Sequence, residues 1–108
     1  MHWTQIATNY WVSPQIDEQE VAMAANEGFE VIVCNRPDNE APDQINSDII
    51  QAATEKAGMK YVFLPMVGAN FTQDYIDVVK QLHTDEKKVL AYCRSGNRSS
   101  ILFNAAIS

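Results

Sequence analysis

A cysteine and a short polar loop follow an apolar run near the C-terminal end of the chain. The run covers residues 89–92, Cys93 comes next, and the loop after it contains Gly96 and two arginines. A turn from a strand into a helix exposes backbone N–H groups and the positive end of the helix dipole, and both lower the pKa of a thiol placed there. Guanidinium groups suit a phosphate, a sulfate or a similar oxyanion. The pattern therefore predicts a reactive thiolate inside an anion-binding loop.

Each residue of this loop has a role in that prediction. Cys93 is the expected nucleophile, Gly96 lets the backbone approach a ligand closely, and Arg98 can clamp an oxyanion through two parallel hydrogen bonds. The other anion-binding candidates, which contribute hydroxyls, amides or charge, are Arg94, Ser95, Asn97 and Ser99. Two plainer interpretations stay open: most free cysteines are small core residues, and Arg94 is equally well explained as a solvated surface side chain.

The composition is that of an ordinary globular domain. The chain has 108 residues, which suffices for one hydrophobic core and predicts a single domain over residues 1–108. Its formal net charge of −6 opposes binding to nucleic acid or to an anionic membrane surface, so we expect neither partner. The two cysteines, Cys34 and Cys93, are far apart and fit neither a zinc site nor a disulfide framework. We expect no metal and no cofactor.

No sequence signal directs the chain into or across a membrane. No apolar run approaches the ~20 residues that span a bilayer, and the N-terminus lacks the layout of a signal peptide. A reducing cytoplasmic location is therefore the expectation. The sequence stops within an expected helix at Ser108, which suggests that the native chain extends further.

Helical and strand patterns alternate along most of the chain. Four helices are expected, at residues 18–27, 46–57, 72–82 and 99–107. The second and third have apolar side chains at helical spacing behind capping residues, and the first follows turn and cap residues and ends at Gly28. Strands are expected where short β-branched or apolar runs occur, at residues 29–34, 60–64 and 87–92. The predicted fold is a three-layer α/β domain with a mainly parallel central sheet flanked by helices.

Parallel strands bring their C-terminal ends to one edge of a sheet, and ligands bind there in such folds. The loops at that edge are residues 35–42, 65–70 and 93–98. The cysteine loop therefore lies where the fold is expected to place a site. In the first of these loops Asn35 is expected to cap or position the loop, and Arg36 is a candidate second anion contact.

Three landmarks in this order resemble a known family. They are residues 31–38, residues 61–65 and the loop over residues 93–99. Together they resemble the phosphatase-like domain of β-lactamase hydrolase-like proteins, which is related to dual-specificity and tyrosine phosphatases, and the loop also resembles that of rhodanese-type sulfurtransferases. The resemblance implies a dual-specificity-phosphatase-like fold, with Cys93 forming a phosphocysteine and Arg98 holding the phosphoryl oxygens.

Two features depart from the phosphatase pattern. Tyrosine and dual-specificity phosphatases place five residues between the cysteine and the arginine, whereas four separate Cys93 from Arg98, as in the sulfurtransferase loop. Those phosphatases also carry an aspartate as general acid in the loop that corresponds to residues 65–70, which here has no acidic residue. Asp38 and Glu40 are the best substitutes, with Asp38 the catalytic candidate; a turn with a local Arg–Asp pair is the plainer explanation.

Three functions follow from these patterns. The favoured one is a cysteine-dependent phosphatase that acts on a phosphorylated small molecule or protein. The alternative is a sulfurtransferase in which Cys93 carries a persulfide from a sulfur-carrying substrate, and it rests on the loop length and the missing acid. The third is a noncatalytic anion-binding module, which rests on the missing acid alone. The fold does not decide among the three functions, because related sheets host all of them. Cys34 is assigned to core packing, with resolution of an oxidised Cys93 as the less favoured role.

Overall fold

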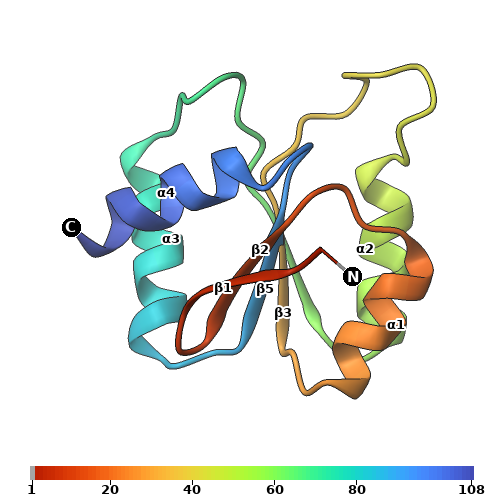
Figure 1. Ribbon diagram of the computed structural model, residues 1–108, viewed down its shortest axis with the longest axis horizontal. Helices are drawn as coiled ribbons and strands as arrows, with labels where there is room; N and C mark the ends of the chain where they lie inside the picture. Colours follow the sequence, from red (N-terminus) through yellow and green to blue (C-terminus); the bar gives the residue numbers. More distant parts are fainter. Residues whose placement is uncertain (1) are drawn as a thin grey trace.

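The fold is a five-stranded sheet with helices on both faces (Figure 1). The computed structural model describes residues 2–108. The elements follow one another as β1 (Thr4–Ala7), β2 (Tyr10–Ser13), α1 (Glu18–Asn26), β3 (Val31–Cys34), α2 (Ser47–Lys56), β4 (Lys60–Phe63), α3 (Gln73–Thr84), β5 (Val89–Tyr92) and α4 (Asn97–Ile107). The predicted three-layer α/β architecture is confirmed, and the expected helices and strands are all present with ends shifted by one or two residues.

The sheet has the strand order β1-β2-β5-β3-β4, and all neighbours except the β1–β2 pair run parallel. β5 lies in the middle, where Tyr92 pairs with Ser13 of β2 on one side and with Cys34 of β3 on the other. The antiparallel β1–β2 pair is not predicted by the sequence pattern. β1 is a partly exposed edge strand whose first two residues are polar, so no apolar run marks it in the sequence.

Two hydrophobic clusters join the layers, one on each face of the sheet. Side chains of β3 and β5 alternate between the faces. The cluster under α3 and α4 includes Val33, Val79, Ala91 and Phe103. The cluster under α1 and α2 includes Val21, Ile32, Ile50 and Leu90. Because β3 and β5 are buried on both faces, their sequences are continuously apolar, as expected for central parallel strands.

The C-terminal ends of β3, β4 and β5 converge at one edge of the sheet, at the top of Figure 1. The segments that leave this edge are residues 35–46, 64–72 and 93–96. α4 begins at Asn97, two residues before its predicted start, because Gly96 takes the N-cap position in a left-handed conformation. The cysteine loop is therefore short, and the first turn of α4 is part of it.

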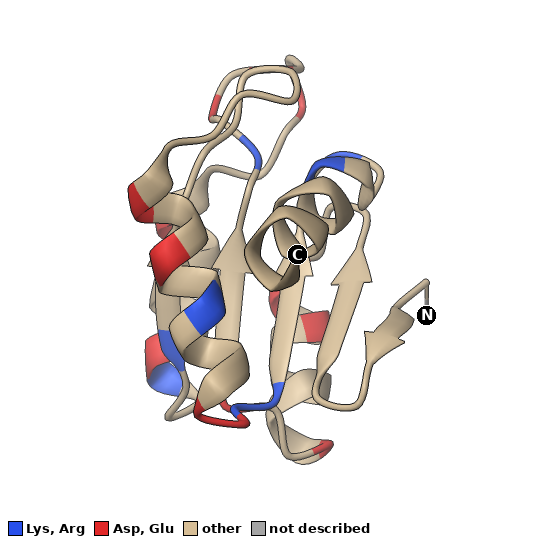
Figure 2. Cartoon of the chain, turned by 90° about the vertical axis from the view of Figure 1, so that its left-hand side faces the viewer, with Lys and Arg blue, Asp and Glu red and all other residues tan. Residues whose placement is uncertain are grey.

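Charged residues are distributed unevenly over the helices on one face of the sheet. Figure 2 shows acidic and basic residues along α3, whereas α4 carries charge only at its start, where Arg98 lies. A cation in the first turn of a helix is disfavoured by the helix dipole, so helix stability does not explain Arg98. Among the described residues, no helix has the length and apolar character needed to cross a membrane.

Candidate active site

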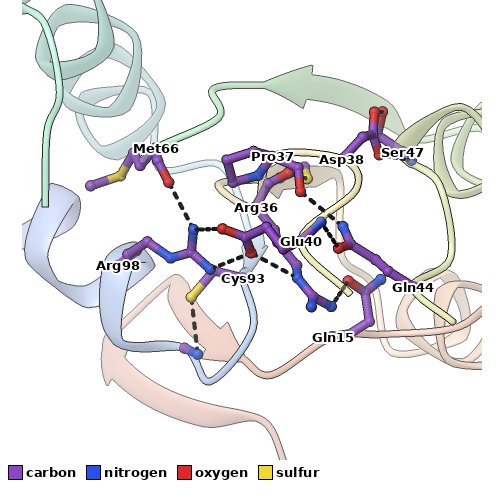
Figure 3. Close-up of polar contacts among 12 residues, drawn as sticks. Gln15, Arg36, Pro37, Asp38, Glu40, Gln44, Ser47, Met66, Cys93 and Arg98 are labelled. Carbon is purple, nitrogen blue, oxygen red and sulfur yellow. Dashed lines mark hydrogen bonds and ion pairs between the residues drawn. The ribbon is translucent and has the colours of Figure 1, made fainter. Parts of the chain in front are cut away.

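The Cys93 side chain is buried at the start of a tight loop between β5 and α4. Its backbone N–H donates to the Ser13 carbonyl at 3.2 Å, which extends the β2–β5 ladder by one residue. The chain then turns, and the Gly96 N–H donates to Cys93 Sγ at 3.0 Å (Figure 3). Gly96 has a φ of +94°, a conformation that L-residues with a side chain rarely adopt. Glycine is therefore the residue that lets this N–H reach the sulfur.

The surroundings of Cys93 favour its thiolate. Burial raises the pKa of the thiol, but the backbone N–H groups of Ser99, Ser95 and Gly96 and the Ser99 hydroxyl lower it, and the net pKa shift is downward. The Ser99 side chain is fully buried, and its hydroxyl has no other hydrogen-bond partner among the described residues. The start of α4 adds the positive end of its dipole. These contacts support the prediction that Cys93 is the nucleophile.

Arg98 binds a carboxylate from a distant loop. Its Nη1 donates to Glu40 Oε2 and its Nη2 donates to Glu40 Oε1, both at 2.8 Å. Nη1 also donates to the Met66 carbonyl at 2.7 Å (Figure 3). The segments that follow β3, β4 and β5 therefore meet at this one guanidinium group, and Glu40 offsets the unfavourable position of the cation at the start of α4.

Arg36 contacts the same carboxylate from within the loop after β3. Its Nε donates to Glu40 Oε1 at 3.0 Å, and its Nη1 donates to Gln15 Oε1 at 3.0 Å. The hydrogen bonds from Arg98 lower the pKa of Glu40 and are the largest effect. Burial raises this pKa, and the hydrogen bond from Arg36 and both positive charges lower it further, so the net shift is downward. Glu40 is therefore held as a carboxylate and does not supply a proton at neutral pH.

Asp38 lies beside Ser47, apart from Cys93 (Figure 3). Its Oδ1 accepts from the Ser47 N–H and its Oδ2 accepts from the Ser47 hydroxyl, both at 2.7 Å. Asn46 occupies the N-cap position of α2, but its side chain makes no capping hydrogen bond, contrary to the sequence expectation. Asp38 fulfils that role from the preceding loop. A catalytic role for Asp38 stays a prediction that this arrangement does not favour.

Replacing Asp38 with alanine is expected to lower the free energy of unfolding by about 1 kcal/mol, because the N-terminus of α2 loses its capping side chain. Chemical denaturation measures the change, with Asp43→Ala as the control, since Asp43 is exposed in the same loop. A loss of enzymatic rate in Asp38→Ala far beyond its loss of folded protein would instead assign the acid–base role to this residue.

Asn35 holds the three segments in register. Its N–H donates to the Tyr92 carbonyl at 2.7 Å, its carbonyl accepts from the Met66 N–H at 3.0 Å, and its Nδ2 donates to the Leu64 carbonyl at 3.0 Å. Each of these bonds joins the end of β3 to the end of a neighbouring strand. The expectation that Asn35 positions its loop is therefore confirmed.

The remaining candidates of the cysteine loop face solvent. Arg94, Ser95 and Asn97 are exposed, and the Ser95 hydroxyl accepts from the Asn97 N–H at 3.3 Å. An anion-binding role for their side chains stays a prediction, and exposure fits the plainer interpretation of Arg94 as a surface residue.

The structure thus brings together part of the predicted site and adds residues to it. The predicted residues that meet are Arg36, Cys93, Gly96, Arg98 and Ser99. Gln15, the Met66 carbonyl and the carboxylate contact of Glu40 are additions. Arg36 and Glu40 are four residues apart in the sequence, and this spacing is a signal for the ion pair between them. The Arg98 contacts span more than thirty residues of sequence and leave no such local signal.

Cys34 is a core residue. It packs in the cluster under α1 and α2, and its thiol donates to the Arg36 carbonyl at 3.3 Å. Burial raises the pKa of this thiol. Both cysteines are free thiols, and the burial of Cys34 in this cluster supports core packing. Within residues 2–108, no three His, Cys, Asp or Glu side chains are grouped so as to hold a metal ion.

Comparison with known proteins places this site in a family. Residues 3–108 match the family described as "Beta-lactamase hydrolase-like protein, phosphatase-like domain". A β-lactamase hydrolase-like protein of Xylella fastidiosa (strain Temecula1) is 36% identical over 93 residues, which cover 85% of this chain and 22% of that protein. The chain therefore spans about a fifth of the length of this curated relative.

Solved structures give the same fold. A proposed phosphatase of Neisseria meningitidis Z2491 has a TM-score of 0.79 and 30% identity, covering 93% of this chain and 72% of that one. A proposed phosphatase of Shewanella putrefaciens CN-32 also has a TM-score of 0.79, at 23% identity, covering 96% of this chain and 66% of that one. Enzymes of the protein tyrosine phosphatase type are more distant neighbours. The chain therefore belongs to the phosphatase-like domain family of β-lactamase hydrolase-like proteins.

Proposed function

We propose that this chain is a sulfurtransferase, in which Cys93 takes a sulfane sulfur from an anionic donor such as thiosulfate and passes it to a thiol or to cyanide. The observation that carries the proposal is the engagement of both acids in the loop after β3. Asp38 is bound to Ser47, and Glu40 is held ionised by two arginines. A donor whose leaving group departs without a proton suits such a site, and sulfite is such a leaving group.

The first half of the reaction loads the cysteine. The Cys93 thiolate attacks the outer sulfur of thiosulfate, the new Sγ–S bond forms as the S–S bond of the donor breaks, and sulfite leaves with the electron pair. The product is a persulfide anion on Cys93. The backbone N–H groups of Gly96, Ser95 and Ser99, which already stabilise the thiolate, are placed to stabilise negative charge on this sulfur chain.

The second half returns the cysteine to its starting state. A thiolate or cyanide attacks the terminal sulfur, the Sγ–S bond breaks, and the sulfur leaves as an acceptor persulfide or as thiocyanate. The electron pair of the broken bond remains on Cys93 as its thiolate. Neither half transfers a proton, so the ionised state of Glu40 is no obstacle. The four residues between Cys93 and Arg98 add support, because the loop then has the length of the sulfurtransferase type that it resembles.

Phosphoester hydrolysis is the second candidate, and the planar fork of Arg98 together with the phosphatase-like family favours it. In that reaction Cys93 attacks phosphorus, the ester oxygen leaves, and water releases phosphate from the phosphocysteine. With Glu40 ionised, an aryl phosphate suits the site better than an alkyl phosphate, because a phenolate leaves more readily without a proton than an alkoxide does.

Parallel assays on thiosulfate plus cyanide and on para-nitrophenyl phosphate test the two candidates. We expect the wild-type protein to form thiocyanate at a rate that Cys93→Ser lacks, and to release nitrophenol far more slowly. Cysteine-dependent nitrophenol release without thiocyanate formation would overturn the proposal in favour of the phosphatase. Rates no higher than those of Cys93→Ser in both assays would instead support the noncatalytic anion-binding module.

A further inference from the structure

We propose that Arg36 and Arg98 form a subsite for the anionic group of the donor, that the Glu40 carboxylate fills it in the resting protein, and that a substrate oxyanion binds by displacing this carboxylate. This subsite proposal rests on the proposed function only for the identity of the anion, which is a sulfur donor with a sulfonate-like group or a phosphate-like dianion. Glu40 is then an internal competitor of the substrate.

The geometry is that of a bound oxyanion. Two oxygens of one carboxylate accept from Nη1 and Nη2 of Arg98 at 2.8 Å, and one of them also accepts from Nε of Arg36 at 3.0 Å. Parallel hydrogen bonds of this kind are how a guanidinium group recognises carboxylate, sulfate and phosphate alike. Arg98 also lies beside Cys93 in Figure 3, so an anion held by this arginine is next to the nucleophile.

Both arginines keep other anchors when the carboxylate leaves. Arg98 Nη1 donates to the Met66 carbonyl at 2.7 Å, and Arg36 Nη1 donates to Gln15 Oε1 at 3.0 Å. The guanidinium groups are therefore pre-positioned by contacts that do not involve Glu40. This arrangement differs from one in which the glutamate serves to hold the arginine in place.

Glu40 is the partner that can move. Its side chain is 26% exposed, whereas those of Arg36 and Arg98 are 6% and 14% exposed. Its backbone is fixed, because the Glu40 N–H donates to Gln44 Oε1 at 2.9 Å and Gln44 Nε2 donates to the Pro37 carbonyl at 2.9 Å. A side-chain rotation toward solvent therefore frees the subsite without rearrangement of the loop.

Anion binding without turnover tests this proposal. In the Cys93→Ser background, isothermal titration with thiosulfate and with inorganic phosphate gives the affinity of the subsite. Glu40→Gln keeps the shape of the side chain and removes its charge, and we expect it to tighten binding of both anions about tenfold, equivalent to about 1.4 kcal/mol. Asp43→Asn removes the same charge from an exposed position of the same loop and is expected to change the affinity far less.

A further variant ties the gain to the second arginine. Adding Arg36→Gln to Glu40→Gln is expected to abolish the gain in affinity. Unchanged or weaker binding in Glu40→Gln would overturn the proposal and make Glu40 a residue that positions Arg98. If Glu40→Gln does not fold, Glu40→Asp replaces it in the same titrations. Its shorter side chain cannot reach both arginines as Glu40 does, so the anion affinity is again expected to rise. Because no turnover is measured, failure of sulfur transfer leaves this result unaffected.

Discussion

Cys93→Ser is expected to reduce the rate of thiocyanate formation by roughly 10³-fold or more, because a serine hydroxyl ionises far less readily than a thiol whose pKa is lowered by its surroundings. The loop amides that lower the pKa of Cys93 cannot lower that of a hydroxyl far enough to ionise it near neutral pH. Steady-state kinetics with thiosulfate and cyanide measure the loss.

The second cysteine provides the matched control. Cys34→Ala removes the other thiol of the chain, which is buried under α1 and α2, and transfer is expected to persist. Titration of thiolate absorbance in the ultraviolet assigns the pKa values: the thiol that ionises below the ordinary range is lost in Cys93→Ser and kept in Cys34→Ala. Transfer that survives in Cys93→Ser at more than a small fraction of the wild-type rate would remove this residue from the mechanism.

Gly96→Ala is expected to damage both stability and transfer. Alanine at a φ of +94° costs about 1–2 kcal/mol in backbone strain. Relief of that strain moves the backbone N–H that donates to Cys93 Sγ, because the strained φ belongs to the same residue; the added Cβ itself makes only ordinary van der Waals contact with the Ser13 backbone. Loss of one such donor is expected to lower the transfer rate by about 10²- to 10³-fold.

Gly58→Ala separates the two effects. Gly58 has a φ of +82°, ends α2 far from the cysteine loop, and has no atom within 4 Å of an added Cβ. We expect Gly58→Ala to lower the melting temperature about as much as Gly96→Ala does, with the transfer rate unchanged. Equal rates in the two variants would show that the Gly96 N–H contributes nothing to the reaction.

The cysteine loop and the parallel sheet were predictable because their signals are local. An apolar run followed by Cys93 and Gly96 specifies a strand, a turn and an exposed row of amides within a few residues of sequence. Regular alternation of helices and strands then fixes which strand ends share an edge. The β1–β2 pair lacks such a signal, because β1 is a partly exposed edge strand that begins with two polar residues.

The polar contacts of the site depend on tertiary structure and could not be predicted. Glu40 and Arg98 are 58 residues apart in the sequence, and only the folded sheet brings their loops together. Asp38 belongs to the same loop as Glu40, yet its side chain caps α2 because Asn46 leaves that position unfilled. The sequence identified both acids as candidates, but their partners decide which chemistry is open to each.

The burial of Cys34 in the core has a consequence for how the two thiols react. Cys34 packs under α1 and α2 and donates to the Arg36 carbonyl, while Cys93 opens the loop into α4, so the two sulfur atoms have different surroundings. Under the proposed function, the sulfur on Cys93 is therefore expected to pass to an acceptor from solution and not to the core thiol of Cys34.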